Sequence, residues 1–112
     1  MNTTLKGLLV GLTLMMGAGQ GMAGYVGGAT VSSVGVNEAG RVFVYINTTI
    51  TQTGCNAARF DVASNSPGAK QILALVTSAL ISGKTINVAT NGCIDTYPLV
   101  GAGAGGYIQV NP

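Results

Sequence analysis

The sequence predicts a mainly β domain with one helix and one disulfide. Only the stretch 66–83 has a convincing helical period, whereas five short segments alternate in the manner of β-strands. One cysteine precedes the helix and another follows it. The element order is β-β-β-α-β-β, which is that of a five-stranded OB-fold-like barrel closed at one end by its helix. A two-layer α+β sandwich is the alternative, but barrel closure removes edge strands that a chain with 7% charged residues could not protect.

The N-terminal residues 1–23 read as a signal peptide. Lys6 supplies a short positive region, residues 8–16 are mostly apolar, and Gly21 and Ala23 offer small residues at the two positions that a signal peptidase reads. A buried N-terminal helix is disfavoured by the crowded glycines, and the apolar run falls short of the ~20 residues that span a bilayer. We therefore expect cleavage after Ala23, one OB-fold-like domain at 24–112, a secreted or periplasmic location and no membrane span.

The predicted mature chain is nearly uncharged. Four basic residues stand against three acidic ones, a net charge of +1. So small a charge gives no electrostatic attraction to nucleic acid or anionic lipid. Neither is expected as a partner, and much uncharged surface is left for contact with another protein.

The two cysteines, Cys55 and Cys93, are expected to form a disulfide in an oxidising compartment. The bond would close a loop of about 39 residues and contribute roughly 4 kcal/mol in the chain-entropy model. The chain contains no histidine to complete a metal site or a thiol nucleophile. No metal or other cofactor is therefore expected.

The expected strands, in chain order, are Thr30–Val36, Arg41–Ile46, Arg59–Ala63, Lys84–Ala89 and Tyr107–Val110. Three stretches between or before them read as irregular: a glycine-rich arm at Gly24–Ala29, a polar loop at Asn47–Gly54, and a long flexible loop at Asp95–Gly106. The first strand should place Ser32, Val34 and Val36 on one face. Phe60, Val62, Ile86 and Val88 are expected to point inward.

The second strand is apolar on both faces. Val42, Val44 and Ile46 line one face, while Phe43 and Tyr45 line the other. Such a strand either lies in a sheet that is covered on both sides or offers its outer face to a partner.

The helix is expected to begin with Ser66 as N-cap and Pro67 in its first turn, and to end at Gly83 in the left-handed conformation. Its core face contains Ile72, Leu73, Val76, Ala79 and Leu80, and Leu75 lies at the border. Its far face contains Lys70, Ala74, Thr77, Ser78 and Ile81. One charge on this face suits helix-against-helix packing, although a low-charge extracellular protein also uses serine and alanine on its surface. Together with Phe43 and Tyr45, this face is a candidate homo-oligomer interface.

A resemblance to a known family rests on two stretches of the sequence. One is Pro67–Val88, in which a helix ends in Ser-Gly-Lys before an alternating strand, and the other is Thr96-Tyr97-Pro98-Leu99. They resemble the binding (B) subunit of subtilase-type AB5 toxins and related small secreted bacterial proteins, and the likeness covers mainly the C-terminal half. The resemblance implies an OB-fold, a ring of five copies with the helices lining its pore, binding of cell-surface glycans, and a catalytic A chain as partner. It would place the far face of the helix in the pore and Thr30–Ile46 at subunit contacts.

The sugar site implied by the resemblance has no direct match. The family's serine ahead of the first strand is missing from Gly24–Ala29, and the nearest hydroxyls belong to Thr30 and Ser32. Sugar sites also use aromatic rings, and Tyr97 is the ring most expected to be exposed, although a tyrosine before proline is equally often a structural plug. Thr30, Ser32 and Tyr97 are therefore the candidate ligand-binding residues.

The residues give no catalytic site. After Glu38 the only side-chain carboxylates are those of Asp61 and Asp95, and we do not expect these two to act as a general acid and a general base. Asp61 lies two residues from Arg59 on the same strand face, which predicts a surface ion pair. We expect a non-enzymatic binding module, glycan-directed and ring-forming, with a structural or assembly protein of the bacterial envelope or extracellular matrix as the alternative.

Overall fold

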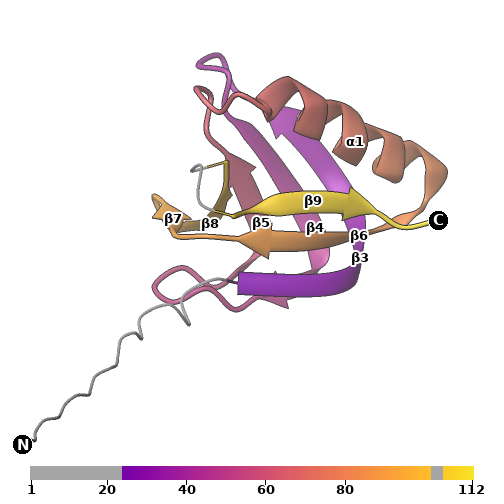
Figure 1. Ribbon diagram of the computed structural model, residues 1–112, viewed down its shortest axis with the longest axis horizontal. Coiled ribbons are helices and arrows are strands. Elements are labelled where there is room, and N and C mark those ends of the chain that lie inside the picture. The colour runs from indigo at the N-terminus through magenta and orange to yellow at the C-terminus, as the bar shows by residue number, and fades with distance from the viewer. Residues whose placement is uncertain (1–23, 102–104) are drawn as a thin grey trace, which may run out of the picture.

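The computed structural model describes residues 24–101 and 105–112, so the predicted signal peptide lies outside the described residues. Its strands are β3 (Gly24–Val36), β4 (Val42–Ile50), β5 (Ala57–Val62), β6 (Thr85–Thr90), β7 (Cys93–Ile94), β8 (Tyr97–Val100) and β9 (Tyr107–Val110). Its helix is α1 (Ala69–Ser82). The strands form one sheet in the order β7-β8-β5-β4-β3-β6-β9, curled into a half-barrel with α1 across its open side (Figure 1).

The mainly β class with one helix is confirmed, but the predicted number of strands is wrong. The described residues form seven strands instead of five. Both additional strands, β7 and β8, lie in or next to the stretch Asp95–Gly106 that was predicted to be a loop. They are two and four residues long, and β8 contains Pro98. Pairing decides their conformation, because β8 lies parallel to β5 and antiparallel to β7.

The longest strand, β3, has 13 residues and joins the two halves of the sheet. Its first half pairs with β6 and its second half with β4, with register shifts between Val26 and Ala29 and between Val31 and Ser33. Gly28, at φ 68°, takes a conformation that suits glycine at the first shift. The predicted arm at Gly24–Ala29 is therefore strand, because its glycines allow the chain to bend without leaving the sheet.

The second register shift also changes the predicted faces of β3. Val31 is buried and Val34 half-buried, whereas Ser32 is exposed. A bulge interrupts strict alternation, so that Val31 and Val34 share the inner face in place of Ser32 and Val34. Strand β4 also continues to Ile50, beyond the predicted end at Ile46, and Ile50 is fully buried.

The core fills the space between the curled sheet and the helix. The four side chains predicted to face inward from β5 and β6 are fully buried, and the inner face of β4 is buried as predicted. From α1, Val76 and Ala79 are buried, and Ile72 and Leu73 pack against the core in part. Leu80 was predicted to face the core but is 39% exposed, because it lies at the border of the packed stripe.

The end of the helix is as predicted and its start is not. Gly83 has φ 74°, and its N–H donates to the carbonyl of Ala79. The helix begins at Ala69, with Gly68 as N-cap and no side-chain cap. Ser66 belongs instead to the preceding turn, since its N–H donates to Ala63 and its carbonyl accepts from Ala69.

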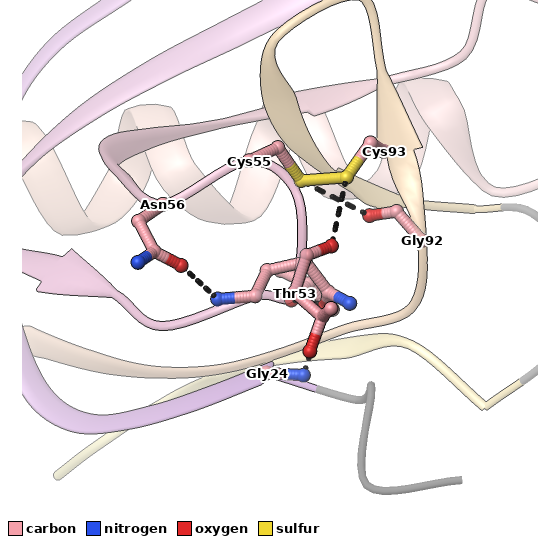
Figure 2. Close-up of a disulfide and its surroundings, with 8 residues drawn as sticks. Gly24, Thr53, Cys55, Asn56, Gly92 and Cys93 are labelled. Carbon is pink, nitrogen blue, oxygen red and sulfur yellow. Dashed lines mark hydrogen bonds between the residues drawn. A yellow bond between two sulfur atoms is a disulfide. The ribbon is translucent and has the colours of Figure 1, made fainter. Parts of the chain in front are cut away.

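The predicted disulfide between Cys55 and Cys93 is present. It ties the loop after β4 to the start of β7, as Figure 2 shows. The Cys55 N–H also donates to the carbonyl of Gln52 at 2.9 Å. The bond therefore holds the β7–β8 arm to the body of the half-barrel.

Replacing both cysteines by serine is expected to lower the free energy of unfolding by about 4 kcal/mol, because a loop closed across 38 residues is released in the unfolded chain. Urea unfolding followed by circular dichroism measures the change. Wild-type protein in reducing agent should show the same loss, and an unchanged midpoint in both samples would contradict the prediction.

Candidate functional site

The outer face of the sheet carries a group of stacked side chains from three strands. Phe43 and Tyr45 come from β4, Arg59 from β5 and Tyr97 from β8; we call these four residues the arginine–aromatic cluster. The alternation of β4 brings the first two to this face, since Val42 and Val44 point inward. Strand pairing then sets Arg59 directly opposite Tyr45.

The guanidinium of Arg59 lies among the three rings. Its central carbon is 3.7 Å from the ring centroid of Tyr97, 4.9 Å from that of Phe43 and 5.2 Å from that of Tyr45. Phe43 and Tyr45 meet edge to face, with centroids 6.4 Å apart. These distances are within the range of cation–π attraction. The three aromatic residues are thus arranged around one cation.

Hydrogen bonds fix the orientation of Arg59. Its Nε and Nη2 donate to the two carboxylate oxygens of Asp61 at 2.8 and 2.9 Å, and its Nη1 donates to the hydroxyl oxygen of Tyr45 at 2.9 Å. The hydrogen bond with Asp61 raises the pKa of Arg59 far above its ordinary value, against an opposing effect of burial. The cation therefore stays charged, and three hydrogen bonds hold its guanidinium in one orientation.

Asp61 has no exposed side-chain surface, so the predicted surface ion pair is wrong: the pair is buried on the side of the carboxylate. Arg41 also donates through Nε to Asp61 at 2.7 Å, and through Nη1 to Asp95 at 2.7 Å. Hydrogen bonding to Asp95, and secondarily to Asp61, raises the pKa of Arg41 despite partial desolvation. One buried carboxylate is thus shared by two arginines.

Asp95 occupies the tight turn between β7 and β8, where it has φ 54°. A non-glycine residue in this region costs on the order of 1 kcal/mol. Its carboxylate is nevertheless directed to Arg41, 54 residues earlier in the chain. The ion pair and the disulfide hold the same short arm in place, and this arm carries Tyr97.

The sequence-predicted ligand residues are only partly brought together. Tyr97 belongs to the arginine–aromatic cluster, but it is half-buried and not exposed as predicted, because its ring covers Arg59. The Ser32 hydroxyl donates to the backbone carbonyl of Tyr45 at 3.2 Å, which places Ser32 beside the cluster. Thr30 is exposed farther along β3, where its N–H donates to the side chain of Asn47.

The predicted interface residues fall on two separate surfaces. Phe43 and Tyr45 lie on the outer face of the sheet, opposite the core on which α1 packs. On the helix, Ile81 is 81% exposed, Thr77 is half-buried, and Lys70, Ala74 and Ser78 are exposed. Leu75 and Leu80 extend the exposed apolar area of the helix.

Sequence reasoning missed Arg41, Arg59 and Asp95 as parts of one site. The only signal was the shared strand face of Arg59 and Asp61. Arg41 and Asp95 are distant in the chain, and a β7–β8 turn was not predicted. No residue pattern could therefore have shown their contact.

A second feature is a hollow of about 290 Å³ between the β3–β4 turn and the start of α1. Most of its lining is apolar, and Lys70 lies at its edge. The arginine–aromatic cluster combines the exposed ring of Tyr45 and two half-buried rings with polar groups in fixed positions, which the hollow does not, and is the stronger candidate site.

Residues 24–101 and 105–112 offer neither a metal site nor a membrane-crossing helix. No group of three or more histidine, cysteine, aspartate or glutamate side chains in this part of the chain could hold a metal ion. No helix there has the length and hydropathy that crossing a membrane requires.

The chain matches no protein-family model, and it has no significant match among curated proteins or solved structures. The resemblance to toxin B subunits therefore remains a prediction from the sequence.

Replacing Asp61 by asparagine is expected to destabilise the fold by about 3 kcal/mol or more, because it leaves two arginines without their shared buried carboxylate. Asp95→Asn is the matched control, and its loss should stay within about 1 kcal/mol since Asp95 is exposed. Urea unfolding of both variants measures the difference. Equal losses would show that the buried carboxylate has no special role.

Proposed function

We propose that the protein is an exported, non-enzymatic binding module that takes carbohydrate on the arginine–aromatic cluster. The observation that carries the proposal is the fixed arrangement of Tyr45, Arg59 and Tyr97 on an accessible sheet face. Sugars are bound by aromatic rings that cover their C–H faces and by polar groups that meet their hydroxyls. Tyr45, with 41% of its surface exposed, offers both a ring and a hydroxyl.

The surroundings of the cluster support a neutral, hydroxyl-rich ligand. Ser32 and Ser33 are exposed on β3 beside Tyr45, and Ser33 pairs with Tyr45 in the β3–β4 ladder. Both arginines near the cluster are engaged by carboxylates, so little uncompensated positive charge is offered to an anionic ligand. The disulfide fits an oxidising compartment and hence a secreted or periplasmic location.

The finer architecture and the partners belong to the same proposal. The curled sheet with a helix across its open side supports an OB-fold-like barrel enlarged by the β7–β8 arm. The resemblance to toxin B subunits adds a pentameric ring, with α1 of each copy toward the pore, and a catalytic A chain as a further partner. The ring would cover the exposed helix residues. The proposal departs from the resemblance at Phe43 and Tyr45, which it assigns to an outer sheet face open to glycan and not to the subunit contact.

Tyr97→Ala is expected to weaken glycan binding about tenfold or more, because it removes the ring nearest Arg59. A glycan array identifies the ligand, and calorimetry then compares the variants. Tyr107→Ala is the control, since Tyr107 is 48% exposed on β9 at the other end of the sheet order and should retain full affinity. Absence of saturable binding to any glycan, or equal weakening in both variants, would count against the proposal.

A role in assembly is the second candidate, and the exposed apolar side of α1 favours it. Ile81, at 81% exposure, is the most exposed large apolar side chain in the described part of the chain. A lone side chain of this kind is ordinary, but this one lies on a helix with a single charge, and Leu75 and Leu80 are exposed at the two borders of its core face.

Ile81→Asp is expected to convert an oligomer to monomers, because a carboxylate on each copy would be desolvated in the helix interface. Light scattering coupled to size-exclusion chromatography measures the mass of wild type and variant. Lys84→Asp is the control just beyond the helix end and should leave the mass unchanged. A wild-type protein that is monomeric at all concentrations would exclude both the ring and the assembly role.

A further inference from the structure

The first described residue, Gly24, begins β3 in a buried polar position. Its N–H donates to Oε1 of Gln52 at 2.9 Å, and Gln52 is itself fully buried. Figure 2 shows this hydrogen bond below the disulfide, at the start of the strand. Strand β3 therefore begins inside the fold, with its first N–H on a defined acceptor.

Three residues, Thr90, Asn56 and Cys55, form hydrogen bonds that hold Gln52 in place. The Thr90 hydroxyl donates to the same Gln52 oxygen at 2.7 Å, and Thr90 is the partner of Gly24 in the β3–β6 ladder. The Gln52 backbone N–H donates to the side chain of Asn56, and its carbonyl accepts from Cys55. The Gln52 side chain is therefore fixed by the strand end and by the disulfide loop.

The space around Gly24 admits no side chain. A Cβ at this position would lie 2.6 Å from the Thr90 Oγ1, 2.9 Å from the Cγ2 of Ile50 and 3.1 Å from the Gln52 Oε1. Two of these contacts are closer than real Cβ atoms approach. Only glycine therefore fits at this position, which directly follows the predicted cleavage point.

We infer that removal of the leader after Ala23 creates an α-amino group at Gly24 that stays captured in this buried site. The peptidase adds water across the Ala23–Gly24 bond, which leaves a carboxylate on Ala23 and an amine on Gly24. The amine keeps a donor for Gln52 Oε1, and the Thr90 Oγ1, whose hydrogen is directed to Gln52, has lone pairs for another amine proton.

The capture has a consequence for the exported protein. A terminus held inside the sheet is inaccessible to aminopeptidases and to amine-modifying reagents, since both require the α-amine to leave the site. The N-terminus would be the least reactive amine of the mature chain, although termini are ordinarily among the most accessible groups.

Limited acetylation of the exported, processed protein with N-hydroxysuccinimidyl acetate tests this inference. Mass spectrometry first establishes the N-terminal residue and then gives the acetylation rate of each amine. Lys70 and Lys84 are exposed and serve as internal references. We expect folding to slow acetylation of the Gly24 amine at least about tenfold relative to urea-unfolded protein, and that of the lysines less than about twofold.

Two variants separate the site from general stability. Thr90→Val keeps the shape but removes the hydroxyl that fixes Gln52, and should raise the rate at the Gly24 amine; Thr49→Val, on an exposed position of β4, should not. An exported chain that begins at another residue, or a wild-type Gly24 amine as reactive as the lysines, would overturn the inference. The wild-type measurement decides the matter even if Thr90→Val fails to fold, and it is independent of glycan binding.

Discussion

The structure depends on one buried carboxylate. Asp61 lies on the outer face of β5, a place where a charge normally meets water, yet its side chain has no exposed surface. It is stable there because Arg41 and Arg59 approach it from two directions and satisfy both oxygens. Arg41 also donates to Asp95 in the β7–β8 turn and so holds that turn against β4, and Arg59 is the centre around which three aromatic rings pack. The ion pairs of one buried carboxylate therefore also hold the arginine–aromatic cluster in place.

The second constraint is the long strand β3, which has to pair with β4 and β6 on different portions of its length. It does so by bending at two register shifts, one of them at a glycine with positive φ. The bend curls the sheet and creates the concave side that α1 covers. It also divides the molecule into a core side, which α1 covers, and an outer face that carries the arginine–aromatic cluster, so that the proposed glycan and assembly surfaces lie apart.

The disulfide and the buried polar group at the start of β3 are neighbours, and both stabilise regions where strands end. The bond secures the loop that follows β4, and that loop positions Gln52 under the first residue of β3. Under the proposed export, oxidation of the cysteines and removal of the leader would be connected through Gln52. In a small domain with few charges, contacts that fix the ends of strands in this way add to a stability that the hydrophobic core alone supplies only in part.

The sequence by itself determined the pairing of the two cysteines, the apolar inner and outer faces of β4, the glycine end of the helix and the mainly β class. Each of these depends on residue type and short-range spacing, through alternation, helical period or the freedom of glycine. Only the tertiary structure decided the strand nature of Gly24–Ala29, the β7–β8 arm, the burial of Asp61 and the gathering of Arg59 with Tyr97. Those features arise from pairing and charge contacts between residues far apart in the chain, whose free energy overrides local preference and leaves no pattern within a short window.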